Sequence, residues 1–135
     1  ELGFSYRNSN LSNHDIITSV IYEGKYSEKN EIDLKINEIK LMRESSQPLK
    51  NRTGGSTFKN PEGQFAAKLI EQAGCKGLTF GDAAVSTIHS NFLINQGKAS
   101  AKDIETLGKI VQEKVFKKLN IYLEWEIKII GENSV

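Results

Sequence analysis

A hydroxyl group that follows two glycines is the feature of this sequence most suggestive of chemistry. The segment Gly54–Pro61 reads GGSTFKNP, so Ser56 stands between a permissive backbone and an amide-rich turn. Glycine adopts backbone conformations closed to other residues and lets a ligand approach the main chain closely. The same residue types also build ordinary surface turns, which is the commoner meaning of so short a motif. Ser56 is therefore a candidate catalytic residue whose role depends on what accompanies it.

Two charged side chains elsewhere in the chain are candidates for stabilising a developing negative charge. Arg7 follows Tyr6, whose ring can hold the planar guanidinium ready for a carboxylate or an enolate. Glu126 lies on the polar side of an alternating segment, where Glu124 competes with it for any role. The alternatives are a solvated arginine near a terminus and the exposed face of a half-buried sheet.

Several familiar kinds of site are missing from the sequence. His14 and His89 stand apart from other metal-binding side chains, so we predict no protein-built metal site and a structural role for His89. The phosphate loop, the nucleophile elbow and the dinucleotide fingerprint are absent. We therefore expect that this chain does not supply the main cradle of a nucleotide cofactor.

Composition narrows the class of protein further. The chain has 135 residues, the size of one ordinary domain, and a net charge of +1 at pH 7, which disfavours nucleic-acid binding. No apolar run approaches membrane-spanning length and no signal-peptide pattern opens the chain, so no membrane association is expected. Cys75 is the only cysteine, which excludes an internal disulfide and fits a reducing compartment. We predict a soluble, cytoplasmic protein, and the start without Met suggests a piece of a longer one.

The first half of the chain contains one predicted strand, one helix and a long loop. Asp15–Glu23 is rich in β-branched and aromatic residues and predicts a strand. Residues 27–46 carry apolar side chains at helical spacing on one side only, which predicts a surface helix. Residues 47–64 show no apolar periodicity and are expected to form the longest loop.

The second half alternates between helices and strands. Phe65–Ala73 is a predicted short helix that Gly74 ends, and Asn91–Asn95 is a predicted strand, whereas residues 79–87 are ambiguous. Ser100 and Asp103 resemble a capping box that opens the clearest helix. The buried stripe expected on that helix consists of Ile104, Leu107, Val111, Val115 and Leu119. Tyr122–Ile130 alternates as a final strand. The order of elements predicts an α+β domain, with parallel pairing through the last helix left open.

Six segments together resemble the C-terminal part of the UDP-N-acetylenolpyruvoylglucosamine reductases, the MurB flavoenzymes of bacterial peptidoglycan synthesis. The segments are Gly3–Ser9, Arg43–Pro48, Gly54–Pro61, Ala66–Gly74, Val85–Asn95 and Leu123–Glu132. Their order spans essentially the whole chain, which makes the resemblance far more specific than any one motif. It implies a small mixed or antiparallel sheet packed with about three helices.

The resemblance also implies a reaction and its residues. In the family, NADPH reduces FAD, and the flavin passes a hydride to the enolpyruvyl group of UDP-N-acetylglucosamine enolpyruvate, which gives UDP-N-acetylmuramate. Ser56 matches the proton donor, and Arg7 and Glu126 match the pair that stabilises the enolate-like intermediate. We choose Glu126 over Glu124 because it directly precedes the run Ile-Lys-Ile-Ile-Gly.

Three further residues are predicted to contact the substrate. They are Tyr6, Lys59 and Asn60. Lys59 could lower the pKa of the Ser56 hydroxyl or bind a phosphate. The alternative to the enzyme is a non-catalytic sugar-nucleotide-binding module.

The sequence departs from the family pattern in three places. Gly81–Ala84 and Lys50–Arg52 are loop changes, and the FAD-binding segment, which in the family precedes everything present here, is missing. We expect residues 1–24 to end the preceding flavin and substrate region, and residues 25–135 to form the substrate-binding domain. The absence of a tyrosine-bearing inserted loop resembles the shorter family subtype.

Overall fold

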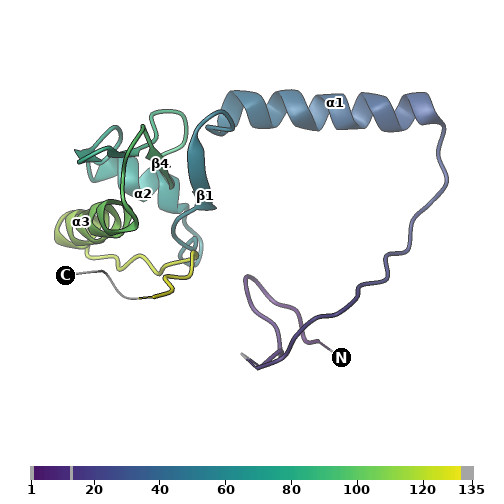
Figure 1. Ribbon diagram of the computed structural model, residues 1–135, viewed down its shortest axis with the longest axis horizontal. Helices are drawn as coiled ribbons and strands as arrows, with labels where there is room; N and C mark the ends of the chain where they lie inside the picture. Colours follow the sequence, from purple (N-terminus) through teal and green to yellow (C-terminus); the bar gives the residue numbers. More distant parts are fainter. Residues whose placement is uncertain (1, 13, 132–135) are drawn as a thin grey trace. The chain divides into compact units, whose positions relative to one another are not determined.

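Three helices and four strands form the regular structure of residues 2–12 and 14–131, which the computed structural model describes (Figure 1). The chain divides between Asn37 and Glu38 into two units, and each is described here by itself. The predicted α+β class is confirmed. None of the helices in the described residues is long and apolar enough to span a membrane.

The first unit shows that the strand predicted at Asp15–Glu23 is wrong for this chain. The segment has no regular structure and pairs with no other described segment. Its large apolar side chains are exposed, with Ile16 at 86%, Ile21 at 97% and Tyr22 at 88%. A strand exists only through hydrogen bonds to a neighbouring strand. The β-branched pattern alone therefore does not make a strand of this segment.

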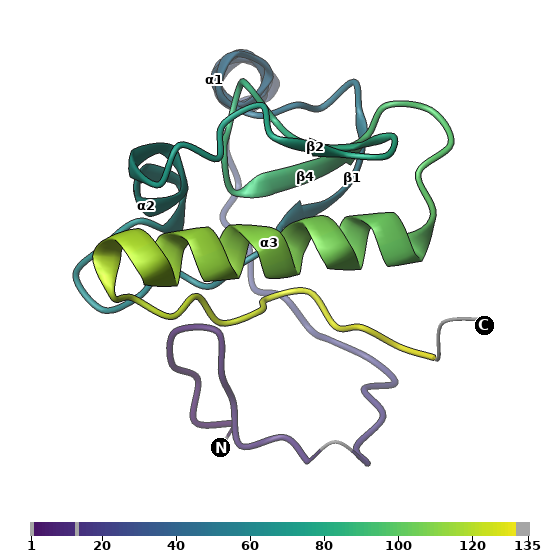
Figure 2. The same ribbon diagram turned by 90° about the vertical axis from the view of Figure 1, so that its left-hand side faces the viewer.

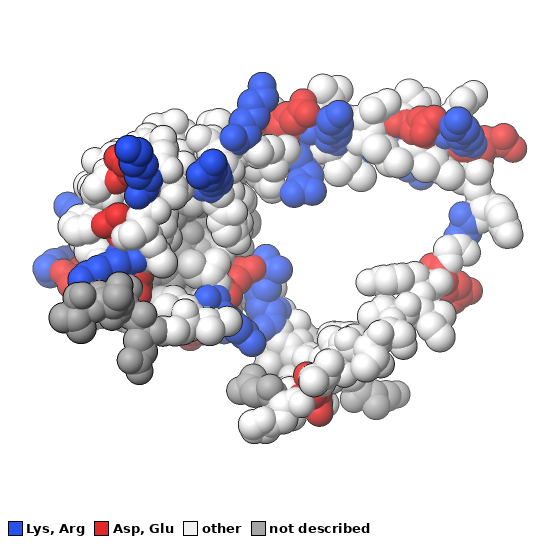
Figure 3. Space-filling model, viewed as in Figure 1, with Lys and Arg blue, Asp and Glu red and all other residues white. Residues whose placement is uncertain are grey.

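The helix predicted over residues 27–46 is confirmed as α1, Lys29–Ser46. It contains no buried residue, and its apolar stripe of Ile32, Ile36 and Ile39 is 43%, 56% and 54% exposed. Blue and red side chains are interspersed along it in Figure 3. A one-sided surface helix is what the sequence predicts.

The second unit is built on an antiparallel sheet with the strand order β1-β4-β3-β2. Its strands are β1 (Arg52–Ser56), β2 (Thr79–Phe80), β3 (Ala83–Val85) and β4 (Phe92–Asn95). β4 confirms the predicted strand, and the ambiguous stretch 79–87 holds the short hairpin of β2 and β3. Every pairing is antiparallel, so the parallel alternative is excluded for this sheet.

β1 lies inside the stretch predicted to be the longest loop, and that prediction is wrong. Arg52 and Thr53 pair with Asn95 and Ile94 of β4, and the register then shifts before Ser56 pairs with Phe92. Gly55 has a φ of +87° within this irregularity, a conformation that favours glycine. The strand depends on its neighbour β4 rather than on its own β-propensity, which the glycines keep low.

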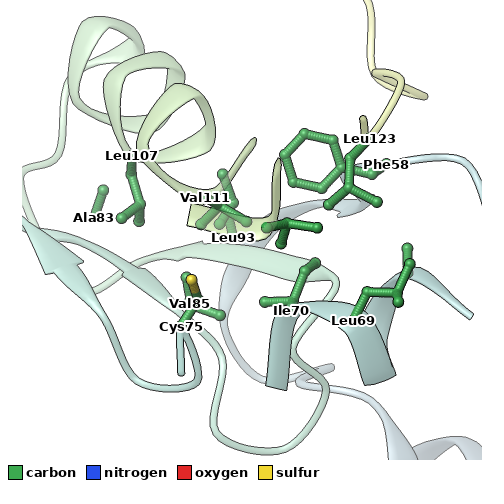
Figure 4. Packing of buried hydrophobic residues seen from close by; sticks show 12 residues of the cluster. Phe58, Leu69, Ile70, Cys75, Ala83, Val85, Leu93, Leu107, Val111 and Leu123 are labelled. Carbon is green, nitrogen blue, oxygen red and sulfur yellow. The ribbon is translucent and has the colours of Figure 1, made fainter. Parts of the chain in front are cut away.

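Helices α2 (Ala66–Gln72) and α3 (Ala101–Leu119) complete the second unit. The Ser100–Asp103 capping box is present and opens α3 as predicted. Figure 2 shows α3 running across one face of the sheet with α2 beside it. Leu107, Val111 and Val115 of the predicted stripe are fully buried, whereas Ile104 and Leu119 pack at the edge of the core. Figure 4 shows Leu107 and Val111 of α3 in the same core as Val85, Leu93 and Ile70.

The strand predicted at Tyr122–Ile130 is wrong, because the segment joins the sheet nowhere in the described residues. It is extended and makes a single isolated bridge, between Trp125 and Phe58. Leu123 is fully buried, but Ile129 and Ile130 are exposed. The alternation of apolar and polar residues in this segment therefore reflects packing against the core only in its first half, at Leu123 and Trp125.

Candidate active site

Ser56 ends β1 at the place where the strand leaves its regular register. The side chain is half-buried, and the positive φ of Gly55 immediately precedes it. The two glycines thus do what the sequence suggests, since they let the backbone take a conformation that other residues disfavour. Ser56 is thus held by its pairing with Phe92 at the end of β1, directly before the buried residues Thr57 and Phe58, and it does not lie on a free surface loop.

Residues 57–59 bind the segment that carries Glu126. The N–H of Glu126 donates to the carbonyl oxygen of Thr57 at 2.9 Å, and the N–H of Lys59 donates to the carbonyl oxygen of Glu124 at 2.8 Å. Between these bonds the rings of Phe58 and Trp125 lie with centroids 4.9 Å apart. The structure therefore brings Glu126 to the residue directly after Ser56.

The structure also separates the two competing glutamates. Glu124 forms an ion pair with Lys59 at 3.3 Å, and the two side chains are 69% and 40% exposed. Glu126 is half-buried. Lys59, predicted to act on Ser56 or to bind a phosphate, thus has a carboxylate neighbour, and its role toward substrate stays a prediction.

A glycine of α3 sets the position of Trp125. A Cβ atom at Gly108 would lie 2.1 Å from Cη2 of Trp125, so the indole occupies the space that any other residue would need. Gln112, one turn on, donates from Nε2 to the carbonyl oxygen of Leu123 at 2.7 Å. Both positions were missed from sequence. The signal was a glycine inside a strong helix on its buried side, which often marks close packing.

Asn91 is a second residue that the sequence reasoning missed as a functional candidate. It is buried, and its side-chain amide binds both backbone groups of Phe58. An asparagine at the start of a strand gives no sign in the sequence of this long-range contact.

Asn60 lies in the same turn but makes a local contact. Its Oδ1 accepts from the N–H of Ala66 at 2.9 Å, the first residue of α2. This bond satisfies one of the amides that the start of a helix leaves unpaired. The predicted contact of Asn60 with substrate stays a prediction.

Arg7 and Tyr6 belong to the first unit. The guanidinium of Arg7 lies over the ring of Tyr6, 5.7 Å from its centroid, as the sequence suggests. The two residues form a tight turn closed by Ser5 and Asn8, and Arg7 has a φ of +55°. A positive φ is uncommon for arginine, which marks this turn as a specific conformation.

His89, predicted to have a structural role, lies in the β3–β4 connection and contacts its neighbours there. His89 accepts from the N–H of Asn91 through Nδ1 at 3.3 Å, and its ring meets the edge of Phe92 at 4.8 Å. In the described part of the chain, no group of three His, Cys, Asp or Glu side chains is placed to hold a metal ion. Burial raises the pKa of the Cys75 thiol.

Two pockets are described in the second unit. The larger, of about 420 Å³, is formed by the start of α3, Trp125 and residues 127–131. The smaller, of about 340 Å³, lies between α3 and Tyr122. Ser56 lines neither of them, whereas Trp125 and Ile127, the neighbours of Glu126, line the larger.

A family model covers the segment that holds this geometry. The model described as "UDP-N-acetylenolpyruvoylglucosamine reductase, C-terminal domain" matches residues 47–130. The chain belongs to this family. Ser56 and Glu126 lie within the matched residues, whereas Tyr6 and Arg7 precede them.

Individual relatives extend the similarity to nearly the whole chain. UDP-N-acetylenolpyruvoylglucosamine reductases from Gluconobacter oxydans and Rickettsia bellii are each 48% identical over 134 residues, 99% of this chain and 44% of the relative. The crystal structure of the MurB reductase from Thermus caldophilus matches with a TM-score of 0.80 and 42% identity, over 94% of this chain and 45% of that one. The chain thus spans less than half the length of the relatives it matches, and its fold agrees with theirs.

Proposed function

We propose that this chain is the substrate-side portion of a UDP-N-acetylmuramate dehydrogenase, an oxidoreductase of peptidoglycan precursor synthesis. The full-length enzyme would reduce UDP-N-acetylglucosamine enolpyruvate to UDP-N-acetylmuramate with electrons from NADPH. The observation that carries the proposal is 48% identity over 99% of the chain to reductases of that name. The hydrogen bond between the N–H of Glu126 and the carbonyl oxygen of Thr57, the residue after Ser56, supports the proposed site.

The reaction needs a proton donor and a means of holding negative charge. FAD, held by the part of the full-length enzyme that this chain does not cover, would supply the hydride for the outer carbon of the enolpyruvyl double bond. The carbon beside the carboxylate then carries the electron pair, which spreads into the carboxylate as an enediolate. Ser56 gives its hydroxyl proton to that carbon. A carbanion is basic enough to take a proton from so weak an acid when the geometry is fixed.

Arg7 and Glu126 are the proposed groups that face the growing charge. A guanidinium stays protonated at all working pH values and binds a carboxylate in a planar, two-pronged manner. Fixed donors aimed at the oxygen where charge develops contribute about 10²- to 10³-fold each. Glu126 serves either as a neutral acid toward that oxygen or as an anchor for Arg7. Tyr6, Lys59 and Asn60 complete the proposed substrate contacts.

The residues described here do not fit FAD as its main cradle. The larger pocket is lined by apolar groups such as Ile104, Trp125 and Ile127, and the sequence has no glycine-rich dinucleotide loop. We therefore assign the FAD cradle to the part of the full-length relatives that this chain does not cover.

The proposal extends to the organisation of the enzyme. Residues 1–24 would belong to the flavin and substrate region and residues 25–135 to the substrate-binding domain. The exposed apolar side chains of Ile16, Ile21 and Tyr22 are the kind of surface that another part of a protein covers, and the FAD domain is the proposed partner. Cys75, a buried free thiol, agrees with a cytoplasmic location.

The test is the activity of the full-length enzyme. Purified enzyme should oxidise NADPH in a manner that depends on UDP-N-acetylglucosamine enolpyruvate, with UDP-N-acetylmuramate as the product. NADPH oxidation that is indifferent to this substrate, in an enzyme that retains its flavin, would contradict the proposal.

A further inference from the structure

The buried side chain of Asn91, the residue before β4, is hydrogen-bonded to the backbone of Phe58. Asn91 is 4% exposed. Its Oδ1 accepts from the N–H of Phe58 at 3.0 Å, and its Nδ2 donates to the carbonyl oxygen of the same residue at 2.8 Å. Its own carbonyl oxygen accepts from the N–H of Thr57 at 2.7 Å. Asn91 thus binds three of the four backbone groups of Thr57 and Phe58, the two residues directly after Ser56.

Residues 57 and 58 need such a partner because they are buried. Thr57 and Phe58 are 2% and 1% exposed, and a buried backbone group without a hydrogen bond is strongly destabilising. Only the carbonyl oxygen of Thr57 is bonded by Glu126. The other three backbone groups of this pair are bonded by Asn91. Asn91 and Glu126 therefore hold the same two residues from opposite sides.

We propose that Asn91 is a positioning residue for the proton transfer, acting through Thr57 and Phe58 on Ser56 and Glu126. This inference rests on the proposed function. Asn91 meets no substrate; it fixes the peptide that follows Ser56 and the carbonyl group to which Glu126 is bonded. A displacement of about 1 Å in reacting groups can cost on the order of 10²-fold in rate, so a loosened turn is enough to slow the step.

The variant Asn91→Asp isolates this contact. It preserves size and the acceptor for the N–H of Phe58, but it faces the Phe58 carbonyl with an oxygen in place of a donor. In the full-length enzyme we expect flavin reduction by NADPH at the wild-type rate. Reoxidation of the flavin by UDP-N-acetylglucosamine enolpyruvate should slow on the order of 10²-fold. Thr57→Val, which removes the hydroxyl that accepts from the N–H of Leu93, loosens the same turn more gently and should slow the same step.

The other end of β4 offers a matched control. Asn95 bonds backbone in the same manner: Nδ2 donates to the carbonyl oxygen of Ala99 at 2.9 Å, and Oδ1 accepts from the N–H groups of Gly97 and Ala99. Asn95→Asp should lower the unfolding temperature without changing the rate of reoxidation relative to reduction. A residue that only stabilises the fold would behave as Asn95 does.

A double mutant distinguishes positioning from general damage. If Asn91 positions Ser56 and Glu126, Asn91→Asp should slow reoxidation by a smaller factor in the Ser56→Ala background than in the wild type, since one of the two groups that it positions is gone. An undiminished effect in the Ser56→Ala background, or wild-type reoxidation in Asn91→Asp and Thr57→Val, would overturn the inference. Wild-type reoxidation in Ser56→Ala alone would instead overturn the role proposed for Ser56.

Discussion

The N–H of Glu126 donates to the carbonyl oxygen of Thr57 at 2.9 Å. This bond joins the last segment of the chain to the turn that follows β1, and it places Glu126 beside the successor of Ser56. The rings of Phe58 and Trp125 lie next to it, tilted by 39° with centroids 4.9 Å apart. Ser56 and Glu126, which are predicted to share a reaction, are thus brought close by backbone and ring contacts of neighbouring residues. These contacts do not involve the side chains of Ser56 and Glu126.

The pair of glutamates gives the first prediction. Glu126→Gln should slow flavin reoxidation by the enolpyruvyl substrate about 10²- to 10³-fold, because the amide replaces the group that meets the developing charge. Glu124→Gln is the control, since Glu124 pairs with Lys59 at an exposed position. Loss of such a pair costs less than about 1 kcal/mol. Stopped-flow measurement of the half-reaction compares them, and a larger loss in Glu124→Gln would reverse the assignment.

Gly108 gives the second prediction. Gly108→Ala should lower the free energy of unfolding by about 1–3 kcal/mol, as overpacking does, because the new Cβ would lie 2.1 Å from Trp125. Chemical denaturation measures the change. In a Trp125→Ala background the same substitution should become stabilising by up to about 1 kcal/mol, since alanine is the better helix former. Equal destabilisation in both backgrounds would show that Trp125 is not the obstacle.

The third prediction concerns the acid end of the stability profile. Hydrogen bonds from Lys76 at 2.9 Å and from the Ser90 hydroxyl at 3.0 Å lower the pKa of Glu71. A lowered pKa in the folded state stabilises the fold above the unfolded-state pKa of about 4.3, and this gain is lost as the pH falls through the folded-state value.

Wild type should therefore be more stable than Glu71→Gln at pH 7, and the difference should shrink below about pH 4.3. It should not exceed about 1 kcal/mol, because the Glu71 side chain is 44% exposed. Denaturant unfolding from pH 3 to pH 7, about the range in which carboxylates titrate, measures it. Glu113→Gln, which breaks a more exposed pair with Lys117, is the control. If the stability difference between wild type and Glu71→Gln grew as the pH fell, it would contradict a lowered pKa of Glu71 in the folded state.

Local signals explain which elements could be predicted from the sequence. α3 carries a capping box and a buried stripe of apolar residues. Each of these signals consists of residues that lie three or four positions apart in the sequence. α2 ends at Gln72, two residues before Gly74, whose φ is +74°. Such features depend on neighbours in sequence, and they were predicted.

The errors concern structure that is set from a distance. β1 forms from glycines because β4 lies beside it, whereas Asp15–Glu23 has strand-forming residues and pairs with no described segment. The last segment packs against α3 and Phe58 instead of joining the sheet. Propensity alone decides none of these cases.

The candidate site divides in the same way. Ser56 was recognisable from the glycines before it, and Arg7 from the ring beside it. Their joint role came from the family resemblance. The contacts of Asn91 and Gly108 link residues far apart in the chain. The glycine inside α3 is a sequence signal for close packing without naming its partner, and Asn91 carries no such signal.

The most direct test is the two half-reactions of Ser56→Ala in the full-length enzyme, followed through the flavin absorbance. NADPH should reduce the flavin at the wild-type rate, because no proton from Ser56 enters that step. Reoxidation by UDP-N-acetylglucosamine enolpyruvate should slow by about 10²- to 10⁴-fold, the usual contribution of a positioned acid. Reoxidation at the wild-type rate, or equal loss of both half-reactions, would contradict the role of Ser56 as proton donor.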